Sequence, residues 1–280
     1  PLPRDRPAFR GAVVRLGMST VQQLALGFSL LSAARQGPCE GFDYNRFWSR
    51  SLATGVAAQN LAPLTRRTAA DEAFTCGLLG TIGQLCLASV HPRDYASVLA
   101  RWDGATDEGL RHLEQEILLI DHDEVTAALM ENWGLPERYR DAIMGLRHLD
   151  AQGAVAGDLS RVLGVAIDVA EICVADDERR PILTEVLLDR AESLGLAAAG
   201  VIAASDRARE DWSRLGEVLD IITEDVPSLT ELAERARHRR HVADHPGEAA
   251  RDSSMDERAR AALLDPEDNP LRVLVVDDSP

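Results

Sequence analysis

The chain has 280 residues, a formal net charge of −16, and a composition that is 45% hydrophobic and only 4% aromatic. This charge excludes nucleic acid and anionic membrane surfaces as expected partners, because binding to either requires a basic patch that displaces counterions. The hydrophobic content is sufficient for a buried core, and alanine, leucine, glutamate and arginine have high helix propensity, so we expect an all-α fold.

The cysteines and the chain start indicate the compartment. The four cysteines show no CxxC spacing, which is typical of reduced, packed thiols. No uninterrupted apolar run reaches about 20 residues, the length needed to span a bilayer. Residues 1–10 are too polar for a signal peptide. We therefore expect a cytoplasmic protein that does not enter the membrane.

Apolar residues at helical spacing predict a series of helices. The stretch 12–31 predicts a short helix, a turn at Gly17 and a second helix. The later helices are bounded by prolines, glycines or polar capping residues. They are expected at about 45–61, 69–87, 92–102, 106–118, 122–133, 136–146, 159–174, 182–193, 197–219 and 228–241. The almost continuously apolar stretch 69–87 is expected to be the most buried.

The composition changes after His241. Residues 242–270 contain prolines, serines and many charges but too little apolar material for a core, which predicts a linker. Residues 271–280 begin with an apolar, β-branched run, which predicts a terminal strand. The predicted organisation is a helical domain over 1–241, the linker, and the first strand of a second domain.

Four phrases of the sequence carry a family resemblance. They are AVVRLGM at 12–18, FWSRSLAT at 47–54, AFTCGLLGTIGQL at 73–85, and DHDEV at 121–125 leading to WGLP at 133–136. In their order and spacing the chain resembles the HDOD family, a branch of the HD phosphohydrolase superfamily found in bacterial signalling proteins. The resemblance implies a multi-helix HD-type bundle. The family usually has another helical segment before the first phrase, so either the bundle is shorter here or the sequence begins within the domain.

The resemblance also implies a degenerate metal site. The superfamily's enzymes hydrolyse phosphate esters with metals held by histidines and aspartates, including an adjacent His-Asp pair in the third phrase. Here that position is Gly80-Thr81, where a missing side chain and a neutral hydroxyl replace the ligands. Where the second phrase commonly carries a histidine, this chain has Arg50, whose permanent cation repels a metal. We therefore expect no enzymatic activity and no cofactor.

Three further positions correspond to ligands of the related enzymes. His122 and His148 fall near ligand positions, and Asp168 corresponds to the final aspartate to within one residue. The residues themselves favour a simpler interpretation of His122, as a helix-start residue in the acidic cluster 121–124, whose carboxylates complement the helix dipole. A C-terminal cap interaction explains His148 as well as a ligand role does.

The predicted terminal strand resembles the start of a response-regulator receiver domain. In that domain an apolar strand ends in paired acids that help to bind magnesium, and Asp277 and Asp278 match those acids. The phosphoacceptor of such a domain would lie beyond residue 280.

Three functional hypotheses follow. The first is a noncatalytic bacterial signal-transduction module, a protein-interaction or regulatory scaffold that binds an unknown signalling protein and is coupled to a receiver domain. The second is a divergent metal-dependent phosphohydrolase of the cyclic-nucleotide class that uses His122, His148 and nearby carboxylates. The third is a sensor that binds a nucleotide without turnover, with Arg50 as phosphate anchor, because guanidinium pairs bidentately with phosphate. The sequence leaves the oligomeric state open.

Overall fold

The computed structural model describes residues 35–65, 67–104, 106–147, 149 and 157–244. All regular structure in these ranges is helical, which confirms the expected all-α class. The chain divides into two units, and the boundary in the sequence falls between Ala233 and Glu234. The expected helices over 12–31, the strand over 271–280, and most of the predicted linker lie outside the described residues.

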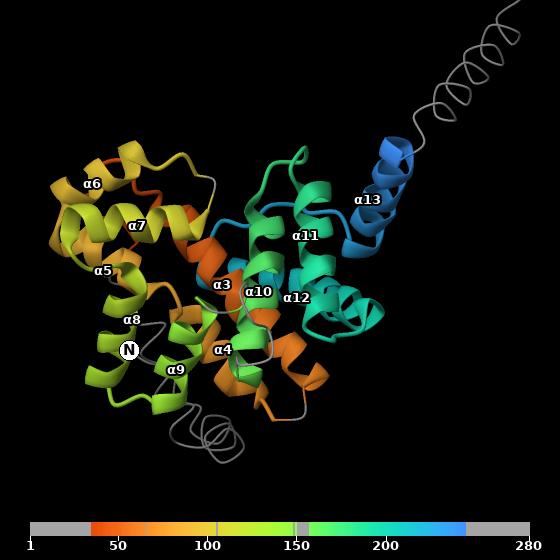
Figure 1. Cartoon of the computed structure of the whole chain (residues 1–280), viewed down its shortest axis with the longest axis horizontal. Coiled ribbons are helices and arrows are strands. Elements are labelled where there is room, and N and C mark those ends of the chain that lie inside the picture. The colour runs from red at the N-terminus through yellow and green to blue at the C-terminus, as the bar shows by residue number, and fades with distance from the viewer. Residues whose placement is uncertain (1–34, 66, 105, 148, 150–156, 245–280) are drawn as a thin grey trace, which may run out of the picture. The chain divides into compact units, whose positions relative to one another are not determined.

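The helices of the first unit follow the predicted ranges closely, with one exception (Figure 1). They are α3 (Tyr44–Leu61), the 3-10 turn η1 (Ala62–Leu64), α4 (Ala70–Leu79), α5 (Ile82–Val90), α6 (Pro92–Arg101), α7 (Asp107–Leu118), α8 (His122–Asn132), α9 (Glu137–Leu146), α10 (Asp158–Val174), α11 (Arg180–Ser193) and α12 (Ala198–Leu219). A last helix, α13 (Leu229–Asp244), begins in the first unit and continues into the second, whose described part is the end of this helix.

The exception is the single helix expected over 69–87, which is wrong. The structure has two helices there, α4 and α5, separated by a turn at Gly80 and Thr81. Glycine has a high entropic cost in a helix and threonine is β-branched, so this pair is the weakest point of the apolar stretch. The turn allows α5 to leave the direction of α4 and to pack against α8.

The same stretch has the composition of a membrane span. Residues Ala70–Val90 have a window of mean hydropathy 1.6, contrary to the expectation that no apolar stretch would be long enough. However, 72% of that window is buried inside the fold, as in a core helix of a globular domain.

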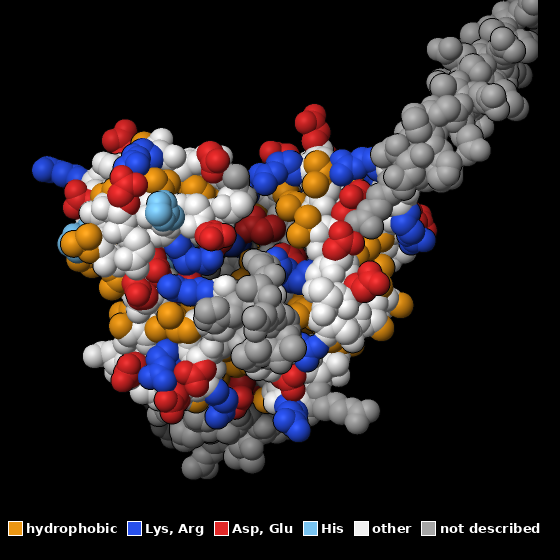
Figure 2. Space-filling model, viewed as in Figure 1, with side chains coloured by type: hydrophobic (Ala, Val, Ile, Leu, Met, Phe, Trp, Pro, Cys, Tyr) orange, Lys and Arg blue, Asp and Glu red, His pale blue; other side chains and the backbone are white. Residues whose placement is uncertain are grey.

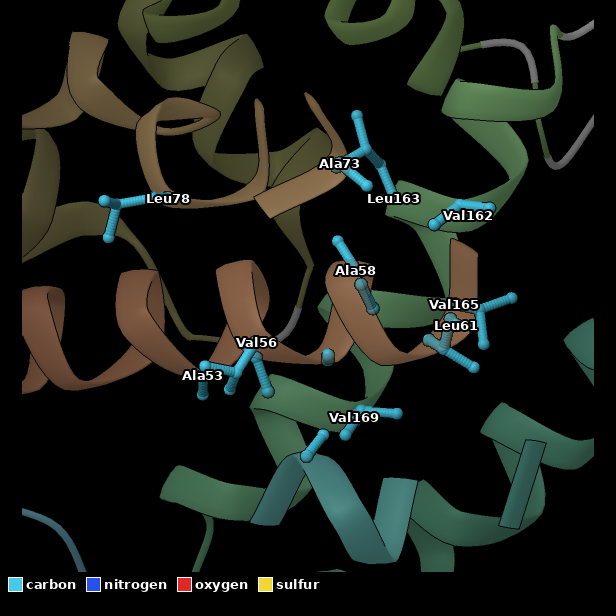
Figure 3. Close-up of a cluster of buried hydrophobic side chains, with 14 of the residues drawn as sticks. Ala53, Val56, Ala58, Leu61, Ala73, Leu78, Val162, Leu163, Val165 and Val169 are labelled. Atoms are coloured by element: carbon cyan, nitrogen blue, oxygen red, sulfur yellow. The ribbon is translucent and has the colours of Figure 1, made fainter. Parts of the chain in front are cut away.

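The main core surrounds α3. Figure 3 shows side chains of α3 facing those of α4 and α10, with Val56, Leu78 and Val169 among them. The crossing of α3 and α4 is close because both helices carry a glycine at the contact. A Cβ atom added to Gly77 would lie 2.8 Å from the carbonyl oxygen of Thr54, so no larger residue fits there without a shift of the backbone.

A second, smaller core holds α5, α6 and α7 together. Its members are Cys39, Leu87, Ala88, Tyr95, Val98 and Leu110. Tyr95 is fully buried in this core, yet its hydroxyl donates a hydrogen bond to Glu114 on α7. The hydroxyl of Tyr95 thus connects this small core to the polar side chains of α7.

The contact between α5 and α8 fixes the start of α8. The backbone N–H of Gly83 donates to the Thr126 hydroxyl at 2.9 Å, and that hydroxyl donates to the carbonyl oxygen of His122 at 2.7 Å. A Cβ atom on Gly83 would lie only 2.0 Å from that carbonyl oxygen. The first residue of α8 is therefore placed by a glycine contact with α5.

Candidate functional site

His122 is the first residue of α8 and is fully buried. The helix begins with a capping box. Oδ1 of Asp121 accepts from the backbone N–H groups of Asp123 and Glu124, both at 3.1 Å, and the Glu124 carboxylate accepts from the N–H of Asp121. This arrangement agrees with the interpretation of His122 as a helix-start residue in an acidic cluster.

Carboxylates surround the imidazole of His122. Its Nδ1 lies 2.6 Å from Oε2 of Glu114, which also accepts from the backbone N–H of His122, while Oε1 accepts from the hydroxyl of Tyr95. Its Nε2 lies 3.6 Å from Asp107 and 3.5 Å from Asp123. Burial lowers the pKa of His122, but the hydrogen bonds with Asp107 and Glu114 outweigh burial and raise it to about 10. The surrounding carboxylates therefore favour the protonated form of His122.

Two arginines bind the same carboxylates from the outer side. Nη1 of Arg111 lies 2.5 Å from Asp107 and 3.4 Å from Asp123. Nε of Arg147 lies 3.2 Å from Asp123, and its Nη2 pairs with Asp121. The acidic groups around His122 are thus tied to cations from α7 and from the end of α9.

Asp107, the first residue of α7, lies near both His122 and Arg111. Burial raises its pKa, but the hydrogen bond with His122 and the charges of His122, Arg50 and Arg111 hold the pKa well below its ordinary range. The Asp107 carboxylate is therefore ionised, and it contacts the cations of α7 and α8. By contrast, burial raises the pKa of Asp123.

Arg50 lies on α3, and its Nε pairs with Glu171 of α10. The Arg50 side chain is 20% exposed and that of Glu171 33% exposed, so water screens this pair only in part. Burial opposes the charged form of Arg50, but Glu171 and Asp107 raise its pKa. The position where the resemblance implies a ligand therefore holds a cation, and a carboxylate of the same chain already binds that cation.

The other predicted positions do not join this group. Gly80 packs against α9, where an added Cβ would lie 3.3 Å from Cδ1 of Ile143, and Thr81 is the residue before α5. Asp168 pairs with Arg190 of α11 at 2.5 Å. His148, Asp277 and Asp278 lie outside the described residues.

The fit to a metal ion is poor. Across the described ranges, no group of three or more histidine, cysteine, aspartate or glutamate side chains has an arrangement that could hold one. The nearest approach to such a group is at His122, whose ring nitrogens face carboxylates as proton donors. The described residues therefore do not match the metal centre that the superfamily's enzymes use.

The sequence interpretation missed the partners of His122 and Arg50. Asp107, Arg111 and Glu114 are spaced by four and three residues, which places them on one face of α7. Glu171 follows Asp168 by three residues, one turn along α10. The spacing shows from the sequence that the residues of each set share one face of their helix. It does not show which other helix packs against that face.

An open depression of about 540 Å³ lies beside this cluster. It is lined by Thr106, Glu108, Gly109, Arg111, His112, Gln115, Asp121 and Arg147. Figure 2 shows arginine and acidic side chains gathered over the region between α7 and α10. The lining carries both signs of charge, so the depression has no clear preference for an anion or a cation.

Comparison with known proteins decides the family. The model of the HDOD domain matches residues 7–148, more than half of the chain. This chain belongs to the HDOD family. The match confirms the family resemblance, whereas the receiver-like segment after this HDOD domain stays a prediction.

Solved structures similar to this HDOD protein include a response regulator. The MmoQ response regulator of Methylococcus capsulatus is 35% identical, with a TM-score of 0.51, over 73% of this chain and 74% of its own. A protein named "Putative phosphohydrolase" from Shewanella amazonensis is 26% identical, with a TM-score of 0.58, over 74% and 75%. An HDOD domain protein of unknown function from Geobacter sulfurreducens, 18% identical over 75% and 74%, shares the fold with a TM-score of 0.55. No curated protein matches the chain.

Proposed function

We propose that this HDOD protein is a noncatalytic signal-transduction module that acts as a protein-interaction or regulatory scaffold. The observation that carries the proposal is the surroundings of four residues at positions where the resemblance implies metal ligands. Arg50 is a cation paired with Glu171, Gly80 and Thr81 form a turn without a ligating group, and the ring nitrogens of the buried His122 face carboxylates. Hydrolysis of a phosphate ester by the superfamily's route requires metal-bound water, and these groups supply no ligand set for it.

The similarity to a response regulator supports the signalling part of the proposal. MmoQ is 35% identical over about three quarters of both chains. The predicted strand with Asp277 and Asp278 extends this proposal to a receiver domain that follows the helical domain and communicates with it. In this setting the partner is a cytoplasmic signalling protein.

The phosphohydrolase hypothesis, which uses His122, His148 and nearby carboxylates, has a different neighbour in its favour. The Shewanella protein whose name contains "phosphohydrolase" is 26% identical. For this chain to share such an activity, the imidazolium of His122 would have to lose a proton against three neighbouring carboxylates before it could bind a metal. We therefore rank this hypothesis second.

The test is metal content and turnover of the whole chain. Protein purified without chelators is analysed by inductively coupled plasma mass spectrometry, and is then assayed with cyclic dinucleotides in the presence of Mn²⁺, Fe²⁺ or Mg²⁺. We expect far less than one metal per chain and the same background rate for the wild type and for His122→Gln. Stoichiometric metal, together with turnover that His122→Gln abolishes, would overturn the proposal.

The nucleotide-sensor hypothesis needs a separate measurement. A cyclic dinucleotide is titrated by calorimetry into the wild type and into Arg50→Ala. Because the guanidinium of Arg50 is already paired with Glu171, we expect no heat of nucleotide binding with either protein. Binding by the wild type that is lost in Arg50→Ala would favour the sensor over the scaffold.

A further inference from the structure

Arg50 occupies a junction between helices. It rises from α3, pairs with Glu171 of α10, and lies close enough to Asp107 of α7 for each to shift the pKa of the other toward the charged form. These helices belong to different parts of the fold. α3 and α10 build the main core, whereas α7 contributes Leu110 to the smaller one.

The carboxylates at this junction divide among the available cations. Glu114 is bound to His122 through both the imidazole and the backbone N–H. Arg111 bridges Asp107 and Asp123. Arg50 is the cation that pairs with Glu171. Loss of its charge would leave the carboxylate of Glu171 partly buried without the cation that it pairs with.

We propose that the guanidinium of Arg50 is the resident cation of this junction, at a position where the resemblance implies a metal ligand, and that it ties α10 to α3 without a bound ion. The proposal rests on the proposed function, because a chain that binds a metal there would not need a resident cation. A tethered cation is present whether or not a metal ion is available, so the contact between α3 and α10 does not depend on metal supply.

The Arg50–Glu171 pair is partly buried, so we expect it to stabilise the fold more than an exposed ion pair does. Arg101 and Glu116 form a two-pronged pair in the same unit, but their side chains are 51% and 50% exposed. Water and salt screen such a pair, whereas the Arg50–Glu171 pair is screened less. The two pairs therefore make a matched comparison within one chain.

The experiment is a double-mutant cycle on the full chain, read by thermal unfolding. Arg50→Gln removes the cation, and we expect the melting temperature to fall by about 3–6 °C. Adding Glu171→Gln removes the orphaned carboxylate and is expected to restore at least half of the loss. Arg50→Lys keeps the charge and should remain closer to the wild type than Arg50→Gln. The control cycle, with Arg101→Gln and Glu116→Gln, should leave the melting temperature unchanged.

Each outcome decides the proposal. Additive losses from Arg50→Gln and Glu171→Gln, or a loss with Arg50→Lys as large as with Arg50→Gln, would overturn it. If Arg50→Gln does not fold, folding of the double variant supports the proposal, and failure of the double variant to fold overturns it. Metal and turnover in the wild type are measured separately and concern the proposed function, so the two failures are distinguishable.

Discussion

Replacing Glu114 by glutamine tests whether the protein holds His122 as an imidazolium. Glu114 is fully buried and accepts hydrogen bonds from the imidazole and backbone N–H of His122 and from the hydroxyl of Tyr95. Glutamine keeps the shape but loses the charge, and its NH₂ group turns a donor toward groups that also donate. Breaking a buried ion pair costs about 3–5 kcal/mol. Because Asp107 and Asp123 remain near Nε2, we expect a loss of about 3 kcal/mol.

The dependence on pH has a definite sign. The pKa of His122 is raised from 6.5 to about 10 in the folded state, so the native protein binds more protons than the unfolded chain between these values. The stabilisation from His122 is therefore fully present below pH 6.5 and is lost as the pH rises through about 10. In Glu114→Gln the part of this stabilisation that comes from Glu114 is removed and the part from Asp107 remains, so the free energy of unfolding should fall less steeply over the same range.

The assay is urea denaturation of the wild type and the variant at pH 6, 8 and 10, followed by circular dichroism. The control is Glu116→Gln, two residues along the same helix, whose half-exposed side chain pairs with Arg101. It should show the wild-type stability and the wild-type dependence on pH. Equal slopes for the wild type and Glu114→Gln, or a loss no larger than in the control, would refute the reasoning.

Two further substitutions test the packing that positions the site. Gly83→Ala places a Cβ 2.0 Å from the carbonyl oxygen of His122, so it should destabilise the fold by about 2 kcal/mol or more in urea denaturation. Gly200→Ala, with Cδ2 of Leu64 at 3.2 Å, is the matched helical control, and equal effects would contradict the close contact. Trp212→Phe removes the hydrogen bond from Nε1 to the carbonyl oxygen of Ser49 in a fully buried setting, for an expected loss of about 2–4 kcal/mol. A melting temperature equal to that of the wild type would show that the hydrogen bond and ring volume contribute little.

The candidate site was accessible to sequence reasoning only in part. The degenerate positions Arg50, Gly80 and Thr81 were visible in the phrases, and the acidic cluster before His122 correctly indicated a helix start. The partners of Arg50 and His122 were not found. Glu171 is 121 residues from Arg50, and no local pattern indicates that α10 meets α3 at that turn.

Apart from the break between α4 and α5, the sequence by itself determined where the described helices lie. Their boundaries depend on interactions within a few residues, such as the Asp43 cap before α3, the proline that begins α6 and the Asp121 capping box. Only the tertiary structure decided which charges meet. The pairing of Arg50 with Glu171, and of His122 with Glu114, depends on helix crossings set by close contacts far apart in sequence, such as Gly77 against Thr54 and Gly83 against His122. A one-dimensional pattern shows the face of a helix, but it does not show what lies opposite.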